Sequence, residues 1–164
     1  MTLYVVTPDP ENGRGGISSV VRAFLQEKEL SKHCSVVISH SELGKWKKFS
    51  QAKSALKQAR KGDAAWFHCG PWLSMLRKKL LSFGLKRKGV KLFFHLHSPT
   101  LENYLNSRVG RLLIRWYLAP ADKVIVVSSY WQELLALRVP EVESKIIVIS
   151  NPVDPEFFSG LRNS

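Results

Sequence analysis

The residues in this sequence best suited to chemistry are a glycine-rich loop and three histidines. Residues 3–25 begin with a β-branched and aromatic run, pass through a loop with Gly13, Gly15 and Gly16, and continue with helical periodicity. A strand, a glycine loop and a helix start form an anion site, because unobstructed amides and the helix dipole face the ligand. The spacing matches neither G-x-G-x-x-G nor a P-loop. We expect a phosphate there; a plain turn without a ligand is the alternative.

The histidines lie within or at the ends of apolar runs. His95 and His97 are two residues apart on one predicted strand, so their side chains point to the same face. His95 lies inside the strand and is interpreted as a hydrogen-bonded core residue. His97, at the strand end, is the better ligand candidate, and His68, at the end of another run, comes next. No paired carboxylates, Ser/His/Asp order or metal-ligand cluster accompanies them, so we expect no metal and no other cofactor.

The rest of the chain must position these residues, and its periodicity predicts a parallel sheet. Six apolar runs occupy residues 3–6, 35–39, 64–68, 91–97, 123–128 and 145–150. After the first helix, helical spacing with an apolar face recurs in 46–61, 72–85, 101–118 and 129–138. Strand and helix alternate about every 25–30 residues, which predicts parallel βαβ units with right-handed crossovers and both sheet faces covered. Ligands bind such sheets outside the carboxyl ends of the strands.

Length and composition indicate one folded domain. The 164 residues are 45% hydrophobic, and Cys34 and Cys69 lack metal-ligand spacing, so we interpret both as buried reduced thiols. No run approaches the ~18 apolar residues of a membrane span, and the N-terminus lacks a signal-peptide pattern. These features predict a cytoplasmic or membrane-peripheral protein.

The positive charge is concentrated in one stretch of the chain. The net charge is +12, and residues 45–91 alone hold fourteen basic residues and one acidic residue, a net of +13. Two main interpretations are a solvated helix face and binding to an anionic membrane surface. Nucleic-acid binding is a third alternative, but we expect no nucleic-acid partner because no fold signature for one is present. The candidates for membrane contact are Lys45, Trp46, Lys47, Lys48, Phe49, Lys53, Arg77, Lys78, Lys79, Lys86, Arg87 and Lys88.

Four segments occur in an order typical of one enzyme family. They are the strand–loop–Gly15-Gly16–helix unit, residues 93–98 (FFHLHS), residues 121–129 (ADKVIVVSS) and residues 147–154 (IVISNPVD). In this order they resemble the N-terminal domain of family 4 retaining glycosyltransferases. The last segment departs from the family's I-P-N-G-V-D pattern, since Ser150 replaces a proline and Pro152 a glycine.

The resemblance implies one half of a GT-B fold, a Rossmann-like α/β domain with an open parallel sheet of six or seven strands. Residues 1–152 would form this acceptor-side domain, and residues 153–164 would begin the linker to an absent donor-binding domain. By the same resemblance, Gly15 and Gly16 approach the donor phosphate or sugar, and His97 contacts the transferred sugar as the catalytic candidate. The acceptor-side candidates are Arg14, His68, Ser98, Ser128 and Asn151.

The expected reaction is sugar transfer from a nucleoside-diphosphate sugar, with anomeric retention, to a membrane-associated or polysaccharide acceptor. No protein nucleophile is expected, and the isolated chain should be inactive without its second domain. The expected location is the inner face of the cell membrane. A non-catalytic domain that binds anionic lipid or polysaccharide and reuses the fold is the alternative.

Overall fold

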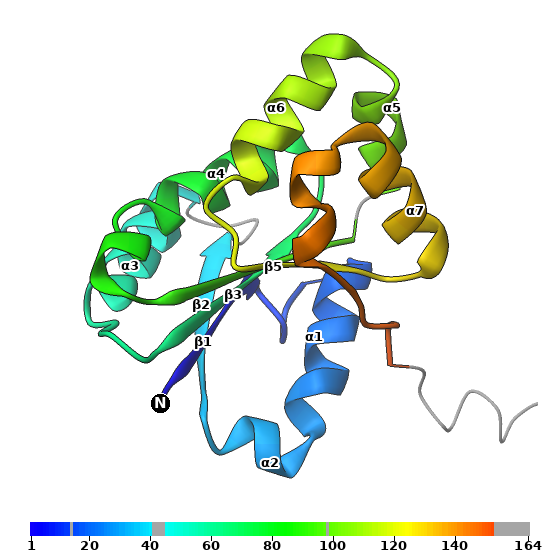
Figure 1. Ribbon diagram of the computed structural model, residues 1–164. Helices are drawn as coiled ribbons and strands as arrows, with labels where there is room; N and C mark the ends of the chain where they lie inside the picture. Colours follow the sequence, from blue (N-terminus) through cyan, green and yellow to red (C-terminus); the bar gives the residue numbers. More distant parts are fainter. Residues whose placement is uncertain (14, 41–44, 98, 153–164) are drawn as a thin grey trace, which may run out of the picture.

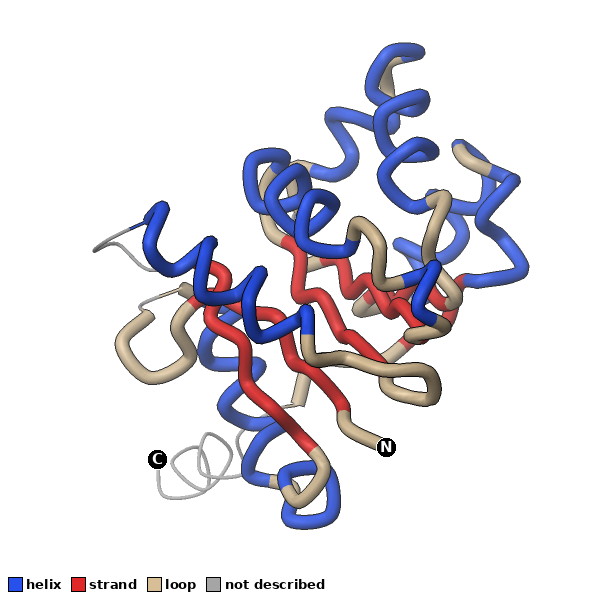
Figure 2. The backbone as a smooth tube through the Cα atoms, turned by 90° about the vertical axis from the view of Figure 1, so that its left-hand side faces the viewer, coloured by secondary structure: helices blue, strands red, loops and turns tan. Residues whose placement is uncertain are grey.

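The fold is built on a sheet in which all strands of the described residues run parallel. The computed structural model describes residues 1–13, 15–40, 45–97 and 99–152. The strand order is β2-β1-β3-β4-β5-β6, and all neighbours pair in parallel, which confirms the predicted α/β class and open parallel sheet (Figure 2). The strands are β1 (Leu3–Pro8), β2 (Cys34–His40), β3 (Ala64–Cys69), β4 (Lys91–Leu96), β5 (Lys123–Val126) and β6 (Ile146–Val148).

Helices cover both faces of the sheet, but unequally. The α-helices are α1 (Gly16–Gln26), α2 (Lys28–Ser31), α3 (Lys45–Lys57), α4 (Trp72–Ser82), α5 (Leu101–Leu105), α6 (Arg108–Leu118) and α7 (Ser129–Arg138). Two 3-10 turns, η1 (Lys86–Lys88) and η2 (Pro140–Lys145), complete the described elements. Helices α1 and α2 lie on one side of the sheet and α3 to α7 on the other (Figure 1).

Two hydrophobic cores result from this arrangement. Successive side chains of a strand point to opposite faces, so Phe67 joins the larger core under α3 to α7, whereas Trp66 joins the smaller core under α1. The alternation puts Cys69 with Phe67 in the larger core. It turns His68 to the side of Trp66, where their ring centroids lie 4.4 Å apart. The strand pattern alone therefore places His68 on the α1 side.

The prediction of a single continuous helix over residues 101–118 is wrong. The segment 101–118 forms two helices, α5 and α6, because Ser107 caps α6: its hydroxyl accepts a hydrogen bond from the Gly110 amide at 2.9 Å. Several predicted elements also end earlier than expected. Helix α3 stops at Lys57 and α4 at Ser82, and the last three strands are shorter at their carboxyl ends.

Gly110 is required where α5 and α6 meet. A Cβ atom at this position would lie 2.1 Å from the carbonyl oxygen of Tyr104 and 2.7 Å from the Ser107 hydroxyl. We predict that Gly110→Ala lowers the free energy of unfolding by about 2 kcal/mol, because the backbones must separate. Urea denaturation measures this, with Gly16→Ala as the control, since nothing lies within 4 Å of a Cβ at Gly16. Equal stability of Gly110→Ala and the unmodified protein would contradict the packing described.

The apolar faces of α4 and α6 point mostly to solvent. In α4 the buried positions include Met75, Lys78 and Leu81, whereas Leu73 and Leu80 are exposed. In α6 the exposed residues include Val109, Leu112, Leu113 and Trp116. Hydrophobic spacing thus indicated helical structure in both segments, although not its bounds, and part of the apolar face that it predicted is exposed.

Both cysteines are free thiols. Cys69 is buried as expected, whereas Cys34 is only half-buried. The Cys69 sulfur lies 2.7 Å from the Tyr117 hydroxyl, and burial raises the pKa of the Cys69 thiol to about 11. Cys69 is therefore a protonated packing residue at neutral pH. The linker predicted at residues 153–164 lies outside the described residues.

Candidate functional site

The candidate site lies at the carboxyl ends of β1, β3 and β4. Strand β1 sits between β2 and β3, and the chain leaves β1 into α1 on one face and β3 into α4 on the other. The strand order therefore reverses between β1 and β3, which is where open α/β sheets bind ligands. Gly70, after β3, and Ile17, in the first turn of α1, meet at this point: a Cβ at Gly70 would lie 3.1 Å from the Ile17 Cδ1 atom.

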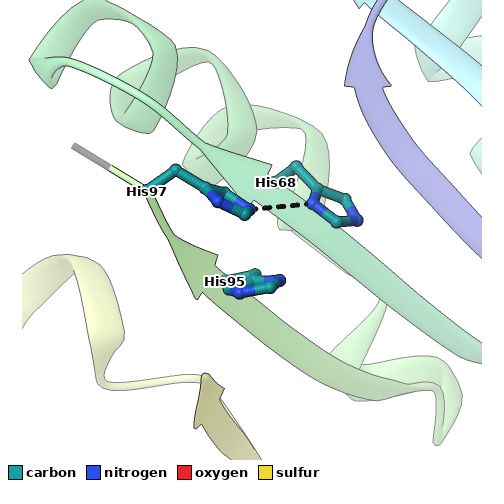
Figure 3. Close-up of side chains that lie close together, drawn as sticks. All are labelled: His68, His95 and His97. Atoms are coloured by element: carbon teal, nitrogen blue, oxygen red, sulfur yellow. Dashed lines mark hydrogen bonds between the residues drawn. The ribbon is translucent and has the colours of Figure 1, made fainter. Parts of the chain in front are cut away.

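Three histidines gather at this edge, and we call them the histidine cluster (His68, His95 and His97). His68 and His95 are directly paired in the β3–β4 ladder, and the His97 amide donates to the Cys69 carbonyl at 2.9 Å. The Nδ1 atom of His68 and the Nε2 atom of His97 are 3.0 Å apart and share a hydrogen bond (Figure 3). The rings of His95 and His97 lie against each other, with centroids 3.9 Å apart.

Burial leaves part of the cluster without hydrogen-bond partners. His68 and His95 are fully buried, and His97 is half-buried. Among the described residues, Nε2 of His68 and both ring nitrogens of His95 have no partner. The interpretation of His95 as a hydrogen-bonded core histidine is therefore wrong: it is in the core, packed parallel to Trp66, but its nitrogens are unpaired. Unpaired buried nitrogens indicate that water or a ligand completes the site.

All three imidazoles are neutral at physiological pH. Burial lowers the pKa of His95 to about 3 and that of His97 to about 4. Burial also holds the pKa of His68 well below its ordinary value, with further lowering by the two other histidines and Lys78. Each ring therefore has one N–H donor and one acceptor nitrogen, which suits hydrogen bonding to uncharged hydroxyl groups.

The cluster also has the composition of a metal site, but its geometry favours hydrogen bonding. One nitrogen from each ring lies within 4.8 Å of the others. Zinc with bonds of about 2.1 Å would need a free lone pair from each ring, all three pointing to one place. In the cluster, two of the nitrogens already bond to each other, and His95 packs against the ring of His97. The interaction that the geometry shows within the cluster is the hydrogen bond between His68 and His97.

The glycine-rich loop presents an open helix start. The Asp9 carboxylate accepts from the Glu11 and Asn12 amides, and the Asp9 carbonyl accepts from the Gly13 amide and the Ser18 hydroxyl. These bonds fold the loop so tightly that a Cβ on Gly13 would clash with Asp9 and Ser18.

Gly15 and Gly16 face open space beyond this folded loop. Gly15 is the N-cap of α1 and makes no side-chain cap, and nothing lies within 4 Å of a Cβ at Gly15 or Gly16. The start of α1 is therefore accessible to an anion.

The remaining site candidates either follow strands other than β1, β3 and β4 or lie outside the described residues. Ser128 is the half-buried N-cap of α7, after the strand next to β4. Asn151 is exposed and follows β6, two strands away from β4. Arg14 and Ser98 lie outside the described residues. The structure thus places His68 in direct contact with His97. It also places the start of α1 next to the β3–α4 turn.

Lys78 lies in the interior, so the prediction that it contacts a membrane is wrong. Predicted as a membrane contact, it is 1% exposed, and its ammonium donates to the Ser74 hydroxyl at 2.7 Å. That hydroxyl in turn accepts from the Gly70 amide. Burial lowers the pKa of Lys78 to about 8, so it remains mostly charged at neutral pH. Lys78 cannot touch a membrane in this fold; it adds positive potential behind the β3–α4 turn.

The other basic candidates are spread over three elements. Lys47 and Lys53 are exposed on α3, where Lys48 and Phe49 are half-buried. Arg77 and Lys79 are half-buried on α4. The side chains of Lys45 and Trp46 lie outside the described set. In η1, Lys86, Arg87 and Lys88 are exposed; Lys86 pairs with Asp122 at 2.6 Å and Lys88 donates to the Lys57 carbonyl.

The fold defines the class of the protein: a Rossmann-like α/β domain whose strand order reverses between β1 and β3. A family model, Glycosyltransferase Family 4, matches residues 26–157, and the chain belongs to this family. It therefore has a glycosyltransferase-type role. No curated protein matches the sequence. None of the helices in the described residues is long and apolar enough to cross a bilayer.

Proposed function

We propose that this protein transfers a sugar from a nucleoside-diphosphate sugar, with anomeric retention, to a lipid-linked or polysaccharide acceptor at the cytoplasmic membrane surface. The observation that carries the proposal is the hydrogen-bonded pair of neutral histidines at the ends of β3 and β4, beside the open start of α1. This edge combines donors for sugar hydroxyls with a site for phosphate.

In the proposed reaction, the start of α1 binds the diphosphate. The amides of Gly15 and Gly16 approach it without steric hindrance, and the helix dipole stabilises the negative charge that grows as the sugar–phosphate bond breaks. Lys78 adds positive potential from beneath the β3–α4 turn. The chain supplies charge stabilisation at this place rather than a nucleophile.

His97 is proposed to hold the transferred sugar through a hydrogen bond. It is the half-exposed member of the histidine cluster, and its Nε2 is bonded to Nδ1 of His68. That bond orients the imidazole of His97. His68 is therefore a positioning residue.

The function is tested by incubating the complete natural protein with a panel of nucleoside-diphosphate sugars and saccharide or lipid-phosphate acceptors. Release of nucleoside diphosphate identifies the donor, and proton NMR of the product reports the anomeric configuration. Acceptor-dependent release with retained configuration is expected. Inverted configuration would contradict the proposed mechanism, and no release with any donor would contradict the proposed function.

Substitution at Gly16 tests the donor site separately from the fold. A Cβ atom at this position meets no protein atom within 4 Å, so we expect Gly16→Val to leave the free energy of unfolding nearly unchanged. It should raise KM for the donor by about 10-fold, because the branched side chain occupies the space through which phosphate approaches the backbone. Ser19→Val, also exposed on α1, is the matched control. Equal KM values for both variants would place the donor elsewhere.

A further inference from the structure

We propose that the exposed side of α4 and α6 docks the protein on an anionic lipid bilayer. We call this surface the α4–α6 face, defined by Trp72, Leu73, Leu76, Leu112, Leu113 and Trp116. It goes beyond the proposed transferase site and uses a surface that shares no residue with the histidine cluster or the start of α1. The two helices lie side by side on the outer side of the sheet (Figure 1).

The α4–α6 face exposes several large apolar side chains. Its six residues are each between 39% and 63% exposed, and Leu80 and Val109 add to it at 55% and 68%. The same helices bury separate apolar sides against the sheet, so these residues are not needed for the core. A contiguous exposed apolar patch of this kind marks an interaction site.

In both helices the exposed apolar residues form an arc apart from the buried side, and basic residues border this arc. At about 100° per residue, Leu112, Leu113 and Trp116 of α6 form a continuous arc between its buried side and its arginines. In α4 the arc of Trp72, Leu73 and Leu76 is flanked by the half-buried Arg77 and Lys79. A buried side, an apolar exposed side and a basic border are the pattern of an interfacial helix.

A groove runs between the two helices within this face. Trp72 and Leu76 of α4 and Leu113 and Trp116 of α6 line it, and its volume is about 210 Å³. Lys79 holds the helices together, since its ammonium donates to the Trp116 carbonyl at 2.8 Å and lies 4.7 Å from the centroid of the Trp116 ring. The groove is therefore preformed and apolar, as a site for a lipid tail would be.

Beside the apolar arc lies a pocket rich in arginine, which we call the arginine pocket. Arg108, Arg111 and Arg115 of α6 and Arg138 of α7 line it, and its volume is about 360 Å³. Arg115 pairs with Glu141 at 2.7 Å, and Arg111 donates to the Leu105 carbonyl. Four guanidinium groups against one carboxylate leave an excess of positive charge, which favours a phosphate group. Leu112 lines both this pocket and the apolar arc.

The charge distribution favours a bilayer over a second copy of the chain. Helices α4 and α6 each contain three basic residues and no acidic residue. A symmetric dimer through this face would bring like charges together, whereas an anionic bilayer offers phosphates to the arginines and hydrocarbon to the leucines and tryptophans. Tryptophan is also the side chain best suited to the membrane interface.

Vesicle binding tests the proposal without any sugar donor. The complete natural protein is sedimented with phosphatidylglycerol vesicles and with phosphatidylcholine vesicles at low and high salt. We expect binding to the anionic vesicles that weakens with salt, and weaker binding to the neutral ones. Equal binding to both, or none to either, would overturn the proposal. The result does not depend on catalysis. If vesicle binding fails, the membrane location in the proposed function falls with it, whereas the sugar-transfer reaction is tested separately by release of nucleoside diphosphate.

Matched variants locate the contact. Leu73→Asn/Leu112→Asn should reduce vesicle affinity at least about 10-fold, because two apolar side chains leave the interface. The control pair Val36→Thr/Leu137→Asn changes exposed apolar residues outside the face and should bind normally. Arg108→Gln/Arg138→Gln should reduce the salt dependence, whereas Lys47→Gln/Lys53→Gln on α3 should not. The proposal fails if the α3 pair alone abolishes binding.

Two further outcomes would identify another occupant. Loss of a concentration-dependent dimer in Leu73→Asn/Leu112→Asn, without vesicle binding by the unmodified protein, would assign the face to a second copy. Binding of glycerol phosphate or inorganic phosphate to the arginine pocket, again without vesicle binding, would assign the pocket to a soluble phosphate compound. Either result overturns the bilayer proposal.

Discussion

Replacement of His97 by alanine in the complete natural protein is expected to lower the rate of sugar transfer by about 100-fold or more, the usual loss for one preorganised hydrogen-bond donor at a reacting centre. His97 stands at the end of β4, half-exposed, with its imidazole fixed by the 3.0 Å bond to His68. Because the imidazole is neutral, it can donate to a sugar hydroxyl without a charge that would need compensation.

The comparison requires a control for folding, because removal of His97 also leaves His68 Nδ1 without its partner. That loss costs stability by about 1–3 kcal/mol, which urea denaturation would show. His33→Ala, at an exposed histidine, should retain full activity and stability. A rate for His97→Ala within about threefold of the unmodified protein would exclude the role proposed for His97.

Mild acid is expected to destabilise the fold strongly. The three clustered imidazoles have pKa values below their ordinary value of 6.5 in the folded protein, about 3 for His95 and about 4 for His97. Above pH 7 they are neutral in both states and contribute nothing to pH dependence. As the pH falls below 6.5, the unfolded chain takes up protons that the folded chain does not, so the free energy of unfolding decreases.

The size of this effect follows from linkage. Each imidazole that is neutral when folded and titrates at 6.5 when unfolded costs about 1.4 kcal/mol between pH 7.5 and 5.5, or about 4 kcal/mol for three. Carboxylates with lowered pKa values, such as Asp63 and Asp122, act at lower pH and do not interfere in this window.

Urea denaturation at pH 7.5 and 5.5 measures the decrease. His95→Phe, which keeps an aromatic ring beside Trp66, should reduce it by about one third. The control His33→Asn removes an exposed histidine outside the cluster. Stability that is constant or rises between pH 7.5 and 5.5 would show that the cluster is not buried as described.

The sheet could be predicted because each of its strands appears as a pattern of neighbouring residues in the sequence. Buried parallel strands appear as continuous apolar runs such as 64–68 and 123–128, and amphipathic spacing between them identifies the helices. The same local reasoning placed His68 and His97 each at the end of a strand, and the structure shows that these strands are neighbours. Positions along one strand are fixed by its period of two.

What could not be predicted depends on how helices rotate against the sheet. Spacing finds an apolar side on α4 but does not show that Met75 and Leu81 face inward while Leu73 and Leu80 remain outside. For the same reason Lys78 was assigned to the surface although Ser74 holds its ammonium in the interior.

The sequence pattern also could not predict that both ring nitrogens of His95 lack hydrogen-bond partners among the described residues. This lack depends on contacts between β3, β4 and α1, since Trp66 and Phe24 pack against this ring. These contacts arise only when the sheet is assembled. The sequence shows that His95 is in a strand, but not whether a partner reaches it.

The central claim is that the start of α1 and the histidine cluster bind one ligand, a nucleoside-diphosphate sugar. NMR of the complete natural protein, labelled with nitrogen-15 in glycine and histidine, tests it most directly by titration with a panel of these donors. We predict that one donor changes the NMR signals of the Gly15 and Gly16 amides and of the His97 imidazole with a single dissociation constant. The signals of the His33 imidazole should not change. If the donor shifts the glycine amides but not His97, or shifts neither set, the proposed site is contradicted.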